Sequence, residues 1–183
     1  MNDGTTGYGS VSYAYSIGKY EVTASQYTAF LNSVAATDTY GLYNTSMASD
    51  EAGCQIIRSG TAGSYTYSVA SDYANRPVNY VSFGDSARFS NWLANGQPTG
   101  TQSASTTESG SYTLSGAVTG AALLAATRNA SATWFVTSEN EWYKAAYHKA
   151  NGPSGSYADY ATNLDDGGGF FCTQPSNRVL SPD

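Results

Sequence analysis

The stretch TSENEWYKAAY, residues 137–147, carries the helix-start signal that best indicates how this chain folds. The opening N–H groups of a helix lack partners within the helix, and a Ser followed three positions later by Glu can satisfy two of them. Ser138 and Glu141 have this spacing, so we expect a capping box. Glu139 lies in the same first turn, where the helix dipole favours negative charge. Because the two Glu side chains point about 200° apart on a helix, they are not expected to act together on one bond.

The same pattern occurs at two earlier positions. Thr23 is followed three residues later by Gln26, and apolar side chains recur after it at helical spacing. Ser82 is followed by Asp85, and this second apolar stripe stops at an Asn-Gly pair, a common helix C-terminal signal. The sequence therefore predicts three helices that begin in the same way. The expected caps are Thr23, Gln26, Ser82, Asp85, Ser138 and Glu141.

Short strand-like runs surround the expected helices. Residues 11–17 alternate apolar and small polar side chains, and residues 78–81 and 134–136 are apolar pieces that lead into caps. Residues 64–69 and 111–114 are typical of hairpin strands in Gly/Ser-rich surroundings. Helices that interrupt short strands without a βαβ rhythm favour an irregular α+β domain. Its core is expected to contain Trp92, Trp134 and Trp142.

Composition limits the classes of partner. A chain of 183 residues has the size of one domain, so we expect a single domain over residues 1–183. Its net charge is −6 and its 8 basic residues are scattered, which argues against nucleic acid and anionic membrane as partners. No apolar run is long enough for membrane insertion. Residues 1–7 do not resemble a signal peptide, but the Lys-poor, Tyr/Ser/Thr/Gly-rich composition suggests an extracellular or periplasmic protein. The oligomeric state stays open.

Few residues suggest chemistry. Cys54 and Cys172 form no CxxC motif, and the single His148 argues against a multi-histidine metal site. A loop-like tail, residues 149–183, carries the oxygen ligands that calcium prefers, although Asp-Gly clusters also form ordinary turns. The candidate metal ligands are Asp159, Asn163, Asp165 and Asp166. Tyrosines in loops suit either ligand contact or local packing, and both interpretations stay open for Tyr40, Tyr43, Tyr157 and Tyr160.

Three blocks together resemble one family. YSIGKYEVT at residues 15–23 with ASQYTAFLN after it, PVNYVSFGDSA at 77–87 running into RFSNWL, and WFVTSENEW at 134–142 occur in order. They are similar to the IGKYEVTNAQY, PVVNVSWDDAVAYCNWL and RLPTEAEWEYA motifs of the formylglycine-generating enzymes, or sulfatase-modifying factors. The scaffold blocks are then residues 13–34, 77–96 and 133–148, with insertions at 35–76 and 97–132. Residues 96–133 look like a surface insertion.

The resemblance implies a C-type-lectin-like variant of the α+β fold. In the family, the catalytic cysteine pair and the calcium loops lie after the third helix, around GNVWEW and RGGSW blocks that this sequence lacks. We therefore expect a domain incomplete on its C-terminal side, with no catalytic residue assigned and its status as an enzyme open. Two functions remain. One is a secreted, non-catalytic recognition or surface module for a protein or glycan, with calcium possible. The other is the N-terminal portion of a copper-dependent oxidase that converts a substrate cysteine to formylglycine, with copper bound only if a downstream cysteine pair exists.

Overall fold

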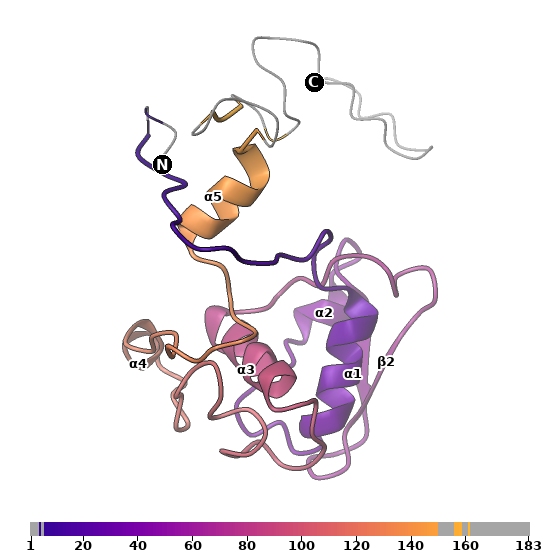
Figure 1. The fold of residues 1–183 in the computed structure, drawn as a ribbon. Helices are drawn as coiled ribbons and strands as arrows, with labels where there is room; N and C mark the ends of the chain where they lie inside the picture. Colours follow the sequence, from indigo (N-terminus) through magenta and orange to yellow (C-terminus); the bar gives the residue numbers. More distant parts are fainter. Residues whose placement is uncertain (1–3, 5, 150–155, 159–160, 162–183) are drawn as a thin grey trace. The chain divides into compact units, whose positions relative to one another are not determined.

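The computed structural model describes residues 4, 6–149, 156–158 and 161 (Figure 1). Its contacts divide the chain into two compact units, Gly18–Val136 and the pair of segments Met1–Ile17 and Thr137–Asp183. The first unit, called the main unit below, contains α1 (Ala24–Val34), α2 (Ser46–Ser49), α3 (Phe83–Ala94) and α4 (Gly120–Leu124). It also contains β1 (Ile56–Ser59) and β2 (Thr66–Val69). The second unit, called the terminal unit, contains α5 (Glu139–Tyr147). The mixed α+β class expected from the sequence is confirmed.

Three helices begin with the capping boxes that the sequence indicated. The side chain of Thr23 accepts a hydrogen bond from the Gln26 N–H, and the Gln26 side chain accepts one from the Thr23 N–H. Ser82 and Asp85 at α3, and Ser138 and Glu141 at α5, make the same reciprocal pair. Each pair satisfies two N–H groups that would otherwise lack partners, which explains why α1, α3 and α5 start where they do.

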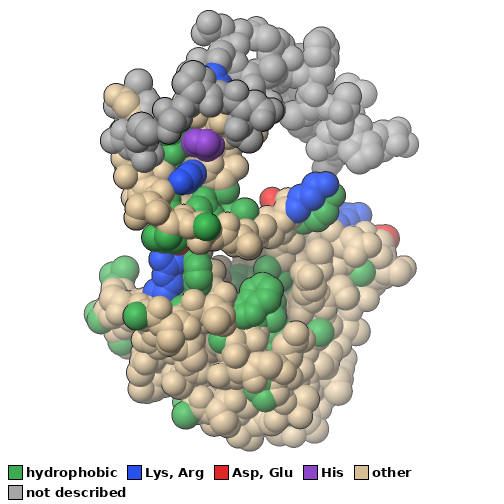
Figure 2. All heavy atoms as spheres, viewed as in Figure 1, with side chains coloured by type: hydrophobic (Ala, Val, Ile, Leu, Met, Phe, Trp, Pro, Cys, Tyr) green, Lys and Arg blue, Asp and Glu red, His purple; other side chains and the backbone are tan. Residues whose placement is uncertain are grey.

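The core of the main unit is built on α1. The buried face of this helix carries Tyr27, Phe30 and Leu31, at the helical spacing expected from the sequence. The Phe30 ring lies 5.3 Å, centroid to centroid, from both Phe89 and Trp92 of α3. The other side of α1 packs on β2 (Figure 1). The helix therefore joins the sheet and α3 into one hydrophobic core. The surface that Figure 2 shows is mostly polar and uncharged.

The sheet is smaller than the sequence suggested. β1 and β2 pair antiparallel, with Ile56 opposite Val69 and Ser59 opposite Thr66. Gly60 begins the connection at a φ of 88°, and a Cβ there would approach the Ser64 carbonyl oxygen to 2.7 Å, so glycine is required. Residues 64–69 thus supply a strand as expected, and β1 is its unforeseen partner.

Other expected strands are corrected by the structure. Residues 11–17 and 134–136 form no strand, residues 78–81 follow a single bridge between Thr23 and Pro77, and residues 111–114 contribute one bridge between Tyr112 and Arg128. Alternation in residues 11–17 reflects contacts with α5 instead, because the Tyr13 hydroxyl donates to Glu141 Oε1 at 2.5 Å. Val11 is buried, but Tyr13 and Ile17 are 49% and 46% exposed, so the expected strand with one buried face is wrong.

Two of the three tryptophans were assigned to the core wrongly. Trp92 is buried, but the exposed fractions of Trp134 and Trp142 are 56% and 54%. In α5 the residue turned inward is Glu141, with no exposed surface, and its neighbour Trp142 points about 100° away around the helix. The capping box and the Tyr13 contact therefore determine which face of α5 is buried.

The two segments read as insertions contribute to the core, which corrects the surface role expected for residues 96–133. Asn32 of α1 donates to the Tyr67 carbonyl at 2.8 Å and accepts from the Tyr67 N–H at 2.9 Å. Asn91 of α3 makes the same two bonds to Tyr112, at 3.0 and 2.8 Å. Each amide pairs with the backbone of one residue as a neighbouring strand would, so Asn32 attaches β2 to α1 and Asn91 attaches the loop at Tyr112 to α3.

Of the helices in the described part of the chain, none has the length and apolar character needed to cross a membrane.

Candidate functional site

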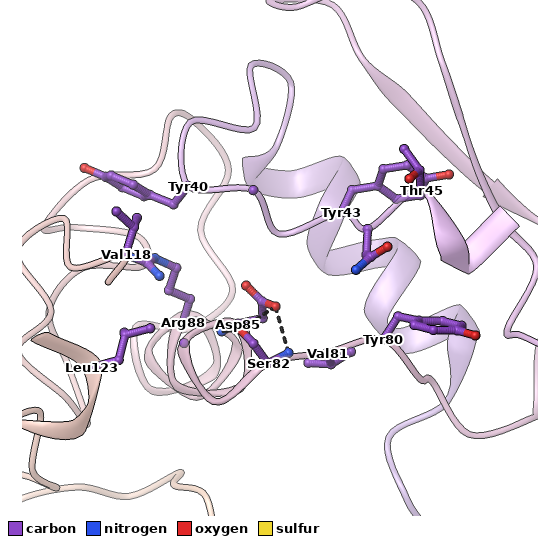
Figure 3. Close-up of a pocket in the computed structure, with 13 residues that line it drawn as sticks. Tyr40, Tyr43, Thr45, Tyr80, Val81, Ser82, Asp85, Arg88, Val118 and Leu123 are labelled. Carbon is purple, nitrogen blue, oxygen red and sulfur yellow. Dashed lines mark hydrogen bonds between the residues drawn. The ribbon is translucent and has the colours of Figure 1, made fainter. Parts of the chain in front are cut away.

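A pocket of about 650 Å³ opens in the main unit between residues 40–45 and the start of α3 (Figure 3). Tyr40 and Tyr43, two of the ligand-contact candidates, line it. Tyr80 and Asp85 contribute from the α3 side, with Arg88 one turn further along the helix. The remaining lining residues are Gly41, Asn44, Thr45, Val81, Ser82, Gly84, Val118 and Leu123. Aromatic rings and polar groups therefore converge on one cavity of the size used by small-molecule sites.

The loop that carries the two tyrosines is held by Asp38. Its backbone adopts a positive φ of 54°, and its carboxylate accepts hydrogen bonds from the N–H groups of Leu42 at 2.7 Å and Tyr43 at 3.3 Å. The same carboxylate lies 3.4 Å from Arg58 Nη1. The Arg58 guanidinium lies 4.7 Å from the centre of the Tyr43 ring. The Tyr43 ring is thus fixed by its backbone and by a cation–π contact.

Asp85 combines a helix-capping role with a position in the pocket. Its Oδ2 accepts hydrogen bonds from the Ser82 N–H at 2.9 Å and from the Ser82 hydroxyl at 2.7 Å. Burial raises the pKa of the Asp85 carboxyl above its ordinary value, against the lowering effect of the Ser82 hydrogen bonds and of Arg88. Oδ1 has no hydrogen-bond partner among the described residues, so one acceptor of a buried carboxyl is available to a ligand.

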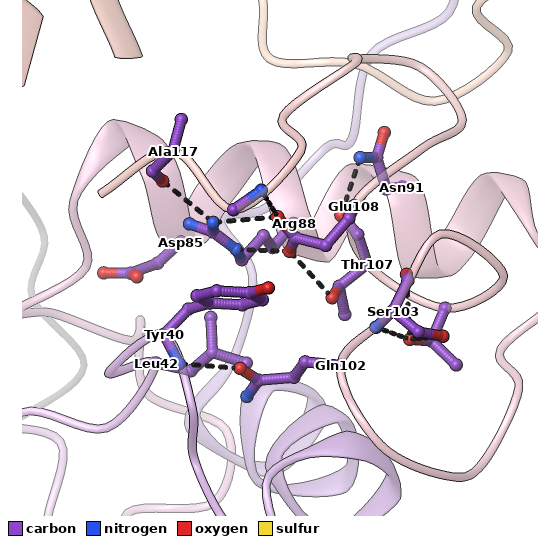
Figure 4. Close-up of polar contacts among 12 residues, drawn as sticks. Tyr40, Leu42, Asp85, Arg88, Asn91, Gln102, Ser103, Thr107, Glu108 and Ala117 are labelled. Carbon is purple, nitrogen blue, oxygen red and sulfur yellow. Dashed lines mark hydrogen bonds and ion pairs between the residues drawn. The ribbon is translucent and has the colours of Figure 1, made fainter. Parts of the chain in front are cut away.

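Arg88 lines the pocket and is almost fully buried. Figure 4 shows its polar contacts with Glu108 and Ala117. Its Nε and Nη2 donate to the two oxygens of Glu108 at 2.7 and 3.0 Å, and Nη2 also donates to the Ala117 carbonyl at 2.9 Å. The Tyr40 ring lies over the guanidinium, 4.5 Å from centroid to Cζ. Among the described residues, Nη1 makes no hydrogen bond. A fixed, charge-compensated donor therefore faces the cavity beside Asp85.

Tyr80 completes the rim. Its φ of 59° is uncommon for a bulky residue, and its hydroxyl donates to Asp50 Oδ2. That hydrogen bond lowers the pKa of the Asp50 carboxyl. In Figure 3 the Tyr40 and Tyr80 rings lie on opposite sides of Asp85. A strained backbone persists only where the surrounding structure holds it in place, and such residues are concentrated at binding sites.

Most of the chain matches a known family. Residues 10–170 match the family model described as the sulfatase-modifying factor enzyme 1-like domain. The chain belongs to this family. The match includes the three capped helices and every residue that lines the pocket of this sulfatase-modifying factor enzyme 1-like domain. No match was found among curated proteins, and none among solved structures.

Of the other predicted ligand-contact and metal residues, Tyr157 lies in the described part of the chain and the rest lie outside it. Tyr157 lies in the terminal unit, where its hydroxyl donates to the Gly9 carbonyl at 2.8 Å and its ring lies 5.6 Å from Tyr143. These contacts are local packing. Tyr160 and the metal candidates Asp159, Asn163, Asp165 and Asp166 lie outside the described residues. Within the described part, no three His, Cys, Asp or Glu side chains gather as a metal site.

Cys54 is not among the residues that line the pocket. Cys54 is a buried free thiol, and its N–H donates to Asn79 Oδ1 at 2.9 Å. Cys172 lies outside the described residues.

Sequence reasoning missed Arg88, Glu108 and Tyr80 as site residues. A signal for Arg88 was present, since an arginine three residues after Asp85 shares its helix face and lies within the apolar stripe of α3. Glu108 lies in the segment treated as a surface insertion and had no periodic context. Tyr80 is identified only by its backbone conformation, which the sequence does not display.

Proposed function

We propose that this domain is a recognition module that binds its ligand in the pocket of the main unit without chemical change. One observation carries the proposal. The buried groups Asp85 and Arg88 each present an unused hydrogen-bonding atom to a cavity walled by tyrosine rings. Neither Asp85 Oδ1 nor Arg88 Nη1 is among the fully buried atoms that lack a partner, so both keep contact with the cavity, where a ligand can form hydrogen bonds with them.

The proposal includes the finer features expected from the sequence. The fold is a C-type-lectin-like form of the family scaffold, and the domain works outside the cytoplasm, in the extracellular or periplasmic space. Its ligand is a protein or a glycan. A calcium ion held by Asp159, Asn163, Asp165 and Asp166 is part of the same proposal.

The test uses a substitution that takes up space in the pocket and keeps the helix. A Cβ at Gly84 would lie 3.0 Å from Leu123 Cδ1 and 3.4 Å from Arg88 Nη1. Alanine also has a higher helix propensity than glycine, so Gly84→Ala is expected to fold. Gly120→Ala in α4 is the matched control, because a Cβ there meets nothing within 4 Å.

We would probe an array that carries both oligosaccharides and peptides with the full chain and both variants. A ligand of the pocket should bind the original chain and Gly120→Ala equally. Gly84→Ala should bind it about tenfold or more weakly, since one methyl group in a pocket has effects of that size. If Gly84→Ala binds every ligand on the array as tightly as the original chain does, the pocket is not the recognition site.

The competing function for this family domain is oxidation of a substrate cysteine with copper. It requires a pair of thiolates, the ligands that select copper(I). Titration of the native polypeptide with copper(I) separates the two functions. We expect no tight thiolate binding, and its detection would favour the oxidase.

A further inference from the structure

The free polar atoms of the pocket form one donor and one acceptor on the same face of α3. Asp85 and Arg88 are three residues apart, a spacing that places side chains together on a helix. Ser82 occupies Oδ2 of the carboxyl and leaves Oδ1. Glu108 and the Ala117 carbonyl occupy Nε and Nη2 of the guanidinium and leave Nη1. Both groups are therefore held in place before any ligand arrives.

The charges around these atoms favour a neutral ligand. Arg88 is already paired with Glu108, so its charge is compensated within the fold. An anion would face the Asp85 carboxylate, and a cation would face the Arg88 guanidinium, because these two groups line the pocket. A neutral ligand with two neighbouring hydroxyls meets neither repulsion, because one hydroxyl can donate to Oδ1 while the other accepts from Nη1.

The walls of the pocket suit a sugar ring. Tyr40, Tyr43 and Tyr80 supply aromatic surface, against which the C–H faces of a pyranose can pack. The cavity of about 650 Å³ lies within the range of small-ligand sites. None of the lining residues belongs to β1 or β2, so an extended peptide would find no sheet edge here to pair with.

We propose that this pocket binds a neutral carbohydrate through a vicinal diol, with one hydroxyl donating to Asp85 Oδ1 and its neighbour accepting from Arg88 Nη1. The inference rests on the proposed recognition function and specifies its ligand. Tyr40 and Tyr80 border the pocket on either side of Asp85 and supply aromatic surface for the ligand at its two ends. A side-chain carboxamide of a peptide, which also combines a donor with an acceptor, is the alternative that the test must exclude.

The experiment titrates the full chain with a panel of neutral methyl glycosides and with their deoxy analogues that lack one hydroxyl of the diol. Asp85→Asn replaces the free acceptor by an amide but leaves an oxygen for the Ser82 cap. Tyr80→Asn removes the rim ring at a 40% exposed position and suits the positive φ, so it is expected to fold even if Asp85→Asn does not. Gly120→Ala is again the control.

At least one glycoside should bind, about tenfold or more weakly to Asp85→Asn and to Tyr80→Asn, and equally to Gly120→Ala. Its deoxy analogue should bind the original chain about tenfold more weakly than the glycoside does. The difference in affinity between the glycoside and its deoxy analogue should be smaller for Asp85→Asn. If no glycoside binds but a peptide binds in a Gly84→Ala-sensitive way, the carbohydrate inference is overturned and the recognition function stands. If neither class of ligand responds to Gly84→Ala, both are overturned.

Discussion

Replacing Glu108 by Gln should destabilise the main unit strongly. The Glu108 carboxylate accepts four hydrogen bonds, from Arg88 Nε at 2.7 Å, Arg88 Nη2 at 3.0 Å, Thr107 Oγ1 at 3.0 Å and the Gly116 N–H at 2.8 Å. Its exposed fraction is 5% and that of Arg88 is 1%. Glutamine removes the negative charge and turns one acceptor toward the guanidinium into a donor. Arg88 then remains buried without its counter-charge.

The expected loss is about 3–5 kcal/mol of unfolding free energy, the usual cost of breaking a buried ion pair from one side. Urea unfolding followed by tryptophan fluorescence measures it, since Trp92 is buried in the same unit. Glu139→Gln makes the same chemical change at an exposed position in the first turn of α5, and it should cost no more than about 1 kcal/mol.

A second arm replaces both partners. Arg88→Met with Glu108→Leu removes both charges of the pair, so the double variant should be more stable than the sum of the two single losses predicts. A loss below about 1 kcal/mol for Glu108→Gln alone would refute the view that this pair is a desolvated, mutually dependent unit.

Three further predictions test other parts of the structure. Ser138→Ala should cost about 1 kcal/mol by removing the α5 cap, and an unchanged denaturant midpoint would contradict that role. Phe30→Ala should cost about 3–5 kcal/mol because the side chain is fully buried, whereas Leu124→Ala, at 88% exposure, should be nearly neutral in the same assay. The raised pKa of Asp85 means that the folded state binds this proton more tightly than the unfolded chain, so its contribution to stability is lost as pH rises from the ordinary carboxyl pKa through the raised one. Asp85→Asn should therefore gain stability relative to the original chain across that pH window, and parallel pH–stability curves would refute the assignment.

The helices were predictable because their starts depend on local chemistry. A side chain three residues from Ser82 or Ser138 reaches the same few N–H groups in any fold, so the capping boxes were visible in the sequence. The alternation in residues 11–17 was equally visible, but it does not say what pairs with it. In the structure Tyr15 donates to the Glu141 carbonyl at 2.5 Å, across 126 positions of sequence. Such a contact has no local signature.

The pocket was predictable only in part. Tyr40 and Tyr43 stood out because tyrosine in a polar loop is uncommon without a reason. The ligand is determined by the polar atoms that stay unbonded after the fold has formed its own hydrogen bonds. Identifying these atoms requires the hydrogen-bond partners of Asp85 and Arg88. One of the partners, Glu108, comes from a segment with no periodicity. The tail residues proposed for calcium remain a prediction.

The amide pairs of Asn32 and Asn91 have an evolutionary consequence. Each amide bonds only to backbone atoms of its partner, Tyr67 in β2 or Tyr112 in the loop after α3, so these bonds do not depend on the neighbouring side chains. Substitutions beside Tyr67 and Tyr112 can therefore accumulate without changing where these two segments are attached. Selection can then change the side chains that contact a ligand while the two asparagines stay constant. The backbone scaffold and the binding specificity of the domain can therefore evolve at different rates.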